Sequence, residues 1–256
     1  MTCHGRLQRG WILNALLLVH GGWFDANCWQ PLLPVLKDLG INAHTISLPG
    51  NGKNAMSAFR ASMRANAAAI CTKLRQIEAP TTLLGHSMGG YSISAAAERS
   101  PELVSDMIYL SAWVPPASGA SMYQFDKEHG AVITGPLVEP ATTWKLWRGE
   151  IDLDPELGAE FLCQLAPRDA RNPLFAHASG QPIRPGLSKL PWTAGRLGQI
   201  PKSYIECTED LAIPLAGQRL FQKNARFEKV VSMESDHCPF VSNPEALSEV
   251  IRDLLA

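Results

Sequence analysis

Residues 81–99 contain the pattern that most constrains how this chain can fold. An apolar run at residues 81–84 (TTLL) leads into residues 85–90 (GHSMGG), and a small-residue helical pattern continues to Arg99. A serine with glycines two residues away on each side can occupy a tight, strained turn between a strand and a helix. The alternative is that these small residues only let a helix pack on a sheet. The flanking strand and helix favour a turn that exposes the Ser87 hydroxyl as a nucleophile, next to helix N–H groups that stabilise negative charge.

Composition limits the classes of protein to which the chain can belong. The 256 residues are 46% hydrophobic and 18% charged, which is typical of one globular domain with room for an insertion. The net charge of −1 and the scattered basic residues provide no surface for nucleic acid or for a membrane. The six cysteines have neither a C-x-x-C pair nor zinc-ligand spacing, so we expect free thiols and no metal. The expected partner is a small molecule.

The N-terminal segment from Met1 to Val19 has some features of a targeting signal. Arg6 and Arg9 precede an apolar run, which is the order found in a signal peptide. However, the run continues directly into residues 20–22 (HGG) without a small-residue cleavage site. We therefore expect the run to be a core strand and the protein to be cytoplasmic.

The chain alternates between predicted strands and predicted helices in both of its outer parts. The expected strands are 15–19, 43–48, 81–84, 103–110, 202–207 and 227–233, and the expected helices are 29–39, 58–77, 91–99, 214–224 and 244–254. In the last helix, Asn243 suits the N-cap and Pro244 the first helical position. This alternation predicts an α/β fold with a doubly wound, mostly parallel sheet.

Between Pro115 and about Pro191 the alternation stops. Proline and glycine punctuate short helical fragments, and no clear strand is visible. Because a structureless loop of this length is improbable in a compact domain, we expect a mostly helical cap insertion at 115–190. Residues 1–114 and 191–256 then form the core. Most aromatic side chains of the cap are expected in its own small core, and the candidates for lining a substrate pocket are Gly21, Trp113, Trp144, Trp147 and Phe161.

A serine hydroxyl needs a base to remove its proton and an acid to orient that base. His237 follows the last predicted strand, at the carboxyl edge of the sheet where Ser87 also emerges. Asp210 follows the strand at 202–207 at the same edge, whereas Glu209 and Asp236 remain alternative acids. The order Ser87, Asp210, His237 favours Asp210.

The residues after the first strand complete the predicted site. His20-Gly21-Gly22 provides a backbone that can approach a ligand closely. We expect the main-chain N–H groups of Gly22 and Met88 to form an oxyanion hole. Two consecutive glycines also suit a tight turn, and both roles are compatible.

With these residues in place, the chain resembles the α/β-hydrolase superfamily over nearly its whole length. The resemblance is strongest to the branch of plant methylesterases, hydroxynitrile lyases and small bacterial esterases that include pyrethroid hydrolases. It rests on residues 18–22 (LVHGG), 85–90 (GHSMGG), 207–214 (CTEDLAIP) and Asp236-His237. It implies a triad of Ser87, Asp210 and His237, an oxyanion hole at Gly22 and Met88, a capped pocket and no cofactor. Homodimers are common in this branch.

Three functions are compatible with this resemblance. The leading one is hydrolysis of carboxylic esters of small to medium apolar substrates through an acyl-enzyme. The second is carbon–carbon lyase chemistry on a cyanohydrin, but the threonine and lysine that the lyases use are Gly21 and Cys238 here, so that hydrolysis is favoured. The third is a non-catalytic receptor that binds a small ligand in the capped pocket.

Overall fold

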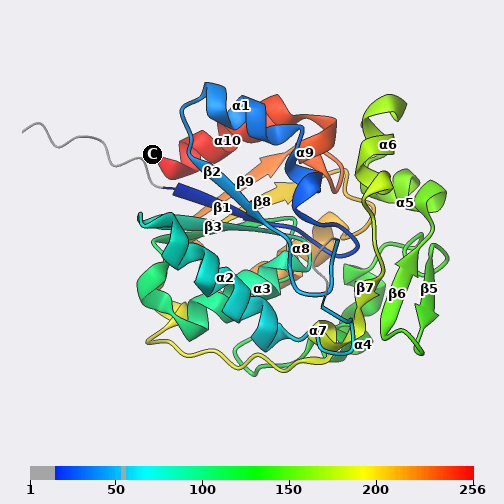
Figure 1. Cartoon of the computed structure of the whole chain (residues 1–256), viewed down its shortest axis with the longest axis horizontal. Coiled ribbons are helices and arrows are strands. Elements are labelled where there is room, and N and C mark those ends of the chain that lie inside the picture. The colour runs from blue at the N-terminus through cyan, green and yellow to red at the C-terminus, as the bar shows by residue number, and fades with distance from the viewer. Residues whose placement is uncertain (1–14, 53–55) are drawn as a thin grey trace, which may run out of the picture.

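The computed structural model describes residues 15–52 and 56–256, and its centre is a six-stranded sheet (Figure 1). The strand order is β2-β1-β3-β4-β8-β9, and every neighbouring pair is parallel. Parallel strands need crossover connections, which the intervening helices supply. The predicted doubly wound sheet is therefore confirmed. Its strands are β1 (Ala15–Val19), β2 (Ala43–Ile46), β3 (Thr81–His86), β4 (Asp106–Leu110), β8 (Lys202–Cys207) and β9 (Lys229–Met233).

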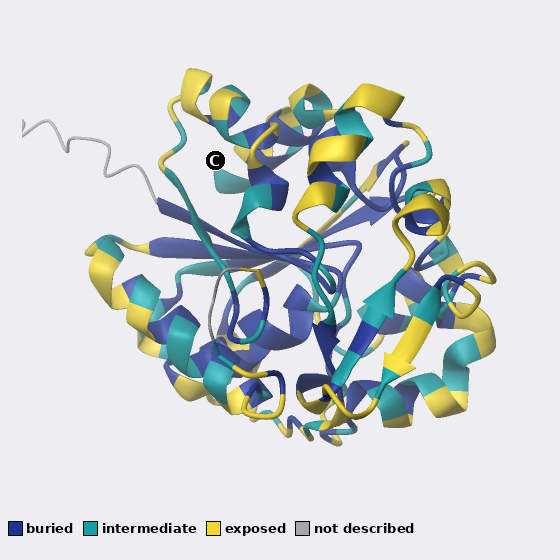
Figure 2. Cartoon of the chain, turned by 45° about the vertical axis from the view of Figure 1, so that its right-hand side comes forward, coloured by how far each residue is buried: buried dark blue, intermediate teal, exposed yellow. Residues whose placement is uncertain are grey.

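The central strands are apolar on both faces because helices cover both faces. In β1, Leu17 and Val19 belong to one apolar cluster, and Leu16 and Leu18 belong to the other. All five residues of β1 are buried, and Figure 2 shows the inner strands as a dark layer between the helices. Residues 1–14 of the signal-like segment lie outside the described residues, but its last five residues form this core strand.

The helices form a layer on each side of the sheet (Figure 1). One layer packs in the cluster around Leu17 and the other in the cluster around Leu16. The first contains α2 (Met63–Ile77), α3 (Gly89–Arg99) and α8 (Leu215–Gln222), and the second contains α1 (Leu32–Asp38), α9 (Pro239–Ser242) and α10 (Pro244–Leu255). Short 3-10 turns lie at Ala26–Trp29 (η1), Pro101–Leu103 (η2) and Leu197–Gln199 (η3).

Capping residues explain where two of the helices begin. The Asn243 side chain accepts a hydrogen bond from the Ala246 N–H and Pro244 occupies the first turn of α10, as the sequence predicted. In α2, the Ser62 side chain accepts from the Ala65 N–H. The helix therefore starts at Met63 rather than near Ala58, because Ser62 satisfies a helix N–H from an extended backbone conformation.

The region predicted as a helical cap also contains a small sheet. Its helices are α4 (Met122–Ile133), α5 (Pro155–Leu162), α6 (Arg168–Ala176) and α7 (Ile183–Leu187). The strands β5 (Thr142–Lys145), β6 (Glu150–Leu153) and β7 (Gln181–Pro182) form an antiparallel sheet that the sequence analysis did not predict. These strands are only two to four residues long, which is too short for alternating polarity to be visible.

The cap elements lie together at one end of the parallel sheet, on the right in Figure 1. In the described residues, all six strands of the parallel sheet come from outside 115–190, and all three strands of the small sheet come from inside it. This distribution supports the division into core and cap, which we retain as a proposal. Within the described ranges, no helix is both long enough and apolar enough to span a membrane.

Candidate active site

Ser87 lies between β3 and α3 in a strained turn. Its φ is +52°, in the left-handed region that non-glycine residues seldom adopt. The Ser87 N–H donates to the Leu110 carbonyl at 3.2 Å, and the Ser87 carbonyl accepts from the Trp113 N–H at 3.1 Å. A Cβ at Gly85 would lie 2.8 Å from the Ile93 side chain, and one at Gly89 would lie 2.7 Å from main-chain oxygens. The turn therefore requires the glycines on both sides of the serine.

His237 and Asp210 meet at the carboxyl edge of the sheet, and both are almost fully buried. Nδ1 of His237 donates to Oδ2 of Asp210 at 2.6 Å. The other oxygen, Oδ1, accepts from the main-chain N–H groups of Ala212 at 2.7 Å and Ile213 at 2.8 Å. These bonds hold the carboxylate in one orientation, and the resulting Nδ1–H tautomer leaves Nε2 of His237 able to accept a proton.

The two alternative acids do not contact the His237 ring. Asp236 accepts from the Cys238 N–H and the Ser242 hydroxyl through Oδ1, and from the Leu165 N–H through Oδ2. Burial raises the pKa of Asp236. Glu209 is exposed, and its carboxylate accepts from the Thr208 hydroxyl. Among the three predicted candidates, only Asp210 is in position to orient His237.

The two other histidines near Ser87 are engaged elsewhere. His86 donates from Nε2 to the main-chain carbonyl of His237 at 2.8 Å, and burial lowers its pKa well below the usual value. His20 accepts from the Leu48 N–H at Nε2 and donates from Nδ1 to the Gly21 carbonyl. Burial lowers the pKa of His20 to about 4. Both imidazoles are therefore neutral near pH 7 and occupied by structural hydrogen bonds.

Gly22 and Met88 lie side by side next to Ser87. A Cβ at Gly22 would be only 2.9 Å from the Met88 sulfur. Met88 immediately precedes α3, so that the helix N-terminus points toward the site. Within the part of the chain that the structure describes, neither main-chain N–H has a hydrogen-bond acceptor. These groups are available to stabilise an oxyanion.

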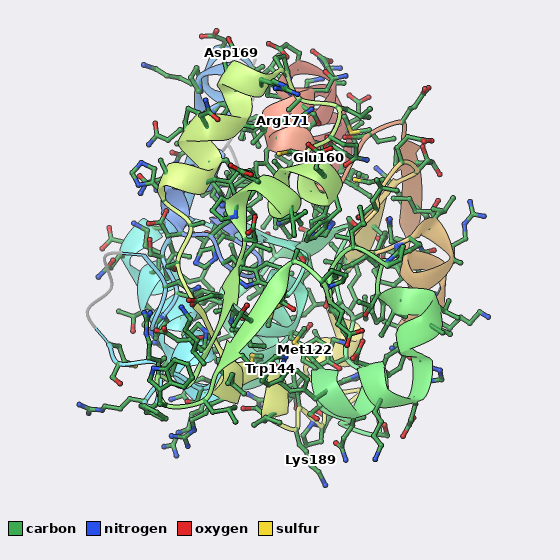
Figure 3. The ribbon with its side chains drawn as sticks, turned by 90° about the vertical axis from the view of Figure 1, so that its right-hand side faces the viewer. Met122, Trp144, Glu160, Asp169, Arg171 and Lys189 are labelled. Carbon is green, nitrogen blue, oxygen red and sulfur yellow. The ribbon has the colours of Figure 1, made fainter. Side chains whose placement is uncertain are left out.

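A cavity of about 620 Å³ opens between the core and the cap at this point. Ser87, Met88 and His237 line it from the core. Trp113, Trp144 and Phe161, three of the candidate pocket residues, also line the cavity. Figure 3 shows the cap side, with Trp144 on β5 and Met122 on α4, both of which line the cavity.

Two of the predicted pocket residues lie elsewhere. Trp147 is 73% exposed and is not among the residues that line the cavity, because it lies in the turn after β5 and projects into solvent. Gly21 is not among the residues that line the cavity and packs behind Ser87. A Cβ there would be 2.8 Å from Cβ of Ser87 and 2.9 Å from Nδ1 of His86. Its role is therefore close packing under the turn.

Several residues of the site were not found by sequence analysis. Trp23, Tyr123 and Gln181 line the cavity, and Trp23 has a φ of +63°. The Trp23 N–H donates to the Gln181 side chain at 3.2 Å, its indole N–H donates to the Ile151 carbonyl, and its carbonyl accepts from the Ser179 N–H. The cap therefore holds the loop that follows Gly22. Trp23 directly follows His20-Gly21-Gly22, and this position next to the predicted oxyanion hole was the one signal in the sequence that could have indicated its place in the site.

The fold and the site together define a class of protein. The Alpha/beta hydrolase family profile matches residues 16–250, and the chain therefore belongs to this family. A pyrethroid hydrolase of Sphingobium wenxiniae is 30% identical over 247 residues, which cover 93% of this chain and 86% of that protein. A second relative is a chloroplastic protein of Arabidopsis thaliana whose name places it among the methylesterases. It is 28% identical over 253 residues. These cover 94% of this chain, whereas the chain spans only 64% of that relative's length.

The crystal structure of polyneuridine aldehyde esterase has the same fold. It superposes with a TM-score of 0.84 and covers 95% of this chain and 99% of its own chain. The sequence identity is 22%, so this likeness concerns the fold alone.

Proposed function

We propose that this chain is a carboxylic-ester hydrolase that works through an acyl-enzyme on Ser87. The observation that carries the proposal is the 2.6 Å hydrogen bond between Asp210 and His237 at the same cavity that Ser87 lines. A nucleophile, a base and an acid that orients the base are the three parts that acyl transfer by serine requires. The names of the family relatives, which are methylesterases and a pyrethroid hydrolase, support the same reaction.

The reaction proceeds in two half-reactions. His237 accepts the Ser87 proton at Nε2 while the serine oxygen attacks the ester carbonyl. The N–H groups of Gly22 and Met88 stabilise the tetrahedral oxyanion. The imidazolium then protonates the departing alkoxide, which leaves as the alcohol, and an acyl group remains on Ser87. Water, deprotonated by His237, attacks the acyl group, and collapse of the second oxyanion releases the acid and regenerates the serine hydroxyl.

The cavity favours small to medium substrates with apolar groups. Trp23, Trp113, Trp144 and Phe161 contribute aromatic surface to its wall. No lysine or arginine lines it among the described residues, whereas Asp126 and Glu139 do. A substrate that carries its own carboxylate would find no cation there, and desolvating it would be costly. We therefore propose neutral esters of apolar acids as the substrates.

A panel of aryl, alkyl, lactone and pyrethroid-like esters at pH 7 tests this function. We expect turnover of neutral aryl or alkyl esters, with slower turnover of analogues that carry a carboxylate. Absence of turnover on the whole panel, combined with tight binding of a small ligand, would favour the receptor alternative instead.

Two properties of the whole protein are also proposed here. The five described cysteines, Cys28, Cys71, Cys163, Cys207 and Cys238, are free and buried, which suits a reducing compartment such as the cytoplasm. A homodimer is the second proposal, and it rests on the family resemblance. Fractionation of the producing cells and light scattering of the purified protein test these two proposals.

A further inference from the structure

Ser111 adopts a strained conformation directly after β4. Its φ is +39°, in the left-handed region, although it is not a glycine. The residue is fully buried, and its N–H donates to the Ile205 carbonyl at 2.9 Å. Strain of this kind persists where the surroundings impose it, and it often accompanies a functional constraint.

The hydroxyl of Ser111 points at the acid of the proposed triad. Its Oγ donates to Oδ2 of Asp210, the same oxygen that accepts the 2.6 Å bond from Nδ1 of His237. Because an ionised carboxylate only accepts hydrogen bonds, Ser111 is the donor. The Ser111 oxygen lies 3.5 Å from Nδ1 of His237, so that the imidazole has Asp210 as its nearer partner.

With Ser111 included, the hydrogen bonds to the buried carboxylate are complete. Oδ1 accepts from the Ala212 and Ile213 N–H groups, and Oδ2 accepts from His237 and Ser111. A carboxylate has about four acceptor positions, and each of the four is filled by a protein donor. Without the Ser111 hydroxyl, one position on Oδ2 would be empty in a site that is closed to solvent.

The segment that carries Ser111 also contacts the nucleophile turn on both sides. The Leu110 carbonyl accepts from the Ser87 N–H, and the Trp113 N–H donates to the Ser87 carbonyl. Residues 110–113 therefore contact the backbone of Ser87 and the carboxylate of Asp210 at the same time.

We propose that Ser111 is a positioning residue for the hydrolysis of esters. Its hydroxyl holds the Asp210 carboxylate so that Oδ2 faces Nδ1 of His237, and its segment aligns that carboxylate with the Ser87 turn. This inference rests on the proposed function. Ser111 is not among the residues that line the cavity, so it acts through Asp210 and not on the substrate.

The test compares two variants that lack the hydroxyl but differ in backbone preference. Ser111→Ala keeps Cβ, whereas Ser111→Gly removes it and favours the positive φ. We expect both variants to lower kcat about tenfold on a neutral aryl ester, with KM changed by less than about twofold, because a hydrogen bond to a charged group is lost. The matched control is Ser248→Ala, which removes the hydroxyl of another buried serine that donates to the Glu245 carbonyl away from the site. We expect it to leave kcat within about twofold of wild type.

The outcomes separate this inference from the proposed function. If Ser111→Gly keeps wild-type kcat, the hydroxyl has no positioning role and the inference is overturned, whatever happens to Ser111→Ala. A loss that appears in KM alone would also overturn it, since a positioning residue acts on the chemical step. Failure of the proposed function would appear in the wild-type protein, as an absence of ester turnover that depends on Ser87.

Discussion

Nε2 of His86 donates a hydrogen bond to the main-chain carbonyl of His237 across 2.8 Å, and the two rings are 4.5 Å apart. The residue before Ser87 thereby holds the loop that carries His237. His86 also packs against Phe240, the third residue after His237 along the chain. His86 therefore has a structural role, because it links the end of β3 to the loop that contains His237.

The first prediction concerns this link. His86→Phe keeps an aromatic ring but leaves the buried His237 carbonyl without its donor. We expect the free energy of unfolding to fall by about 1–3 kcal/mol and kcat to fall with it. Urea unfolding and ester kinetics measure the two effects. Wild-type values for both would show that the hydrogen bond does not hold the loop.

The second prediction concerns the nucleophile. Ser87→Ala removes the attacking oxygen while retaining Cβ, so the turn can form as before. We expect a loss of about 10³-fold or more in kcat with the melting temperature nearly unchanged. Unchanged turnover in the purified, folded variant would contradict the assignment of Ser87.

The third prediction separates the acid from its neighbours. Asp210→Asn is expected to lower kcat less than His237→Ala, because the carboxylate orients and stabilises while the imidazole transfers the proton. Glu209→Gln is the matched control, since Glu209 is exposed and adjacent to Asp210 but does not contact His237. We expect it to be nearly silent. A large loss of kcat in Glu209→Gln, with Asp210→Asn nearly silent, would identify Glu209 as the acid.

The fourth prediction concerns stability at acid pH. The pKa of His20 is about 4 in the folded protein, against an ordinary value of 6.5. Between these values the unfolded state binds the proton and the folded state does not, so stability decreases as pH falls from 6.5 toward 4. This histidine alone is expected to lower the free energy of unfolding by about 2 kcal/mol between pH 7 and pH 5.

His20→Gln provides the comparison for this pH effect. The variant lacks the titrating group, so its free energy of unfolding should depend less steeply on pH over the same range. Urea unfolding at pH 7 and pH 5 for both proteins gives the two slopes. Equal slopes would mean that His20 is not the group responsible.

The fifth prediction concerns the choice between hydrolysis and cyanohydrin cleavage. Gly21 has no hydroxyl, and Cys238 is fully buried in the core with its pKa raised by burial, so neither offers a group that could handle cyanide. We expect purified protein to turn over methyl or aryl esters faster than it releases cyanide from mandelonitrile at the same pH. Faster release of cyanide would establish the lyase reaction instead.

The parallel sheet and the proposed triad were accessible from the sequence because their signals are local. Residues 15–19 and 202–207 are continuous strands whose predicted bounds match β1 and β8. Ser87 lies within a six-residue motif, and Asp210 and His237 lie in the loops that follow β8 and β9. Parallel strands end at one edge, so that three local patterns were sufficient to predict a common site.

Other features depended on contacts between distant parts of the chain. Ser111 and Asp210 are 99 residues apart, and Trp23 and Gln181 are 158 residues apart. The small sheet of the cap was also not predicted. Its strands are too short to show an alternation of polar and apolar residues, and the sequence does not show which strands pair. Trp147 was predicted to line the pocket because it is aromatic, but whether its side chain faces the cavity or solvent depends on tertiary packing, and it is exposed.

By itself, the sequence determined the order of the strands and helices outside residues 115–190, the serine turn and the candidate residues for acyl transfer, because each depends on near neighbours in the chain. Only the tertiary structure showed that Glu209 and Asp236 have other partners, which aromatic side chains enclose the cavity and that Ser111 completes the hydrogen bonds of Asp210. These outcomes depend on packing in a buried site, where most polar atoms have a partner and that partner can lie anywhere in the chain.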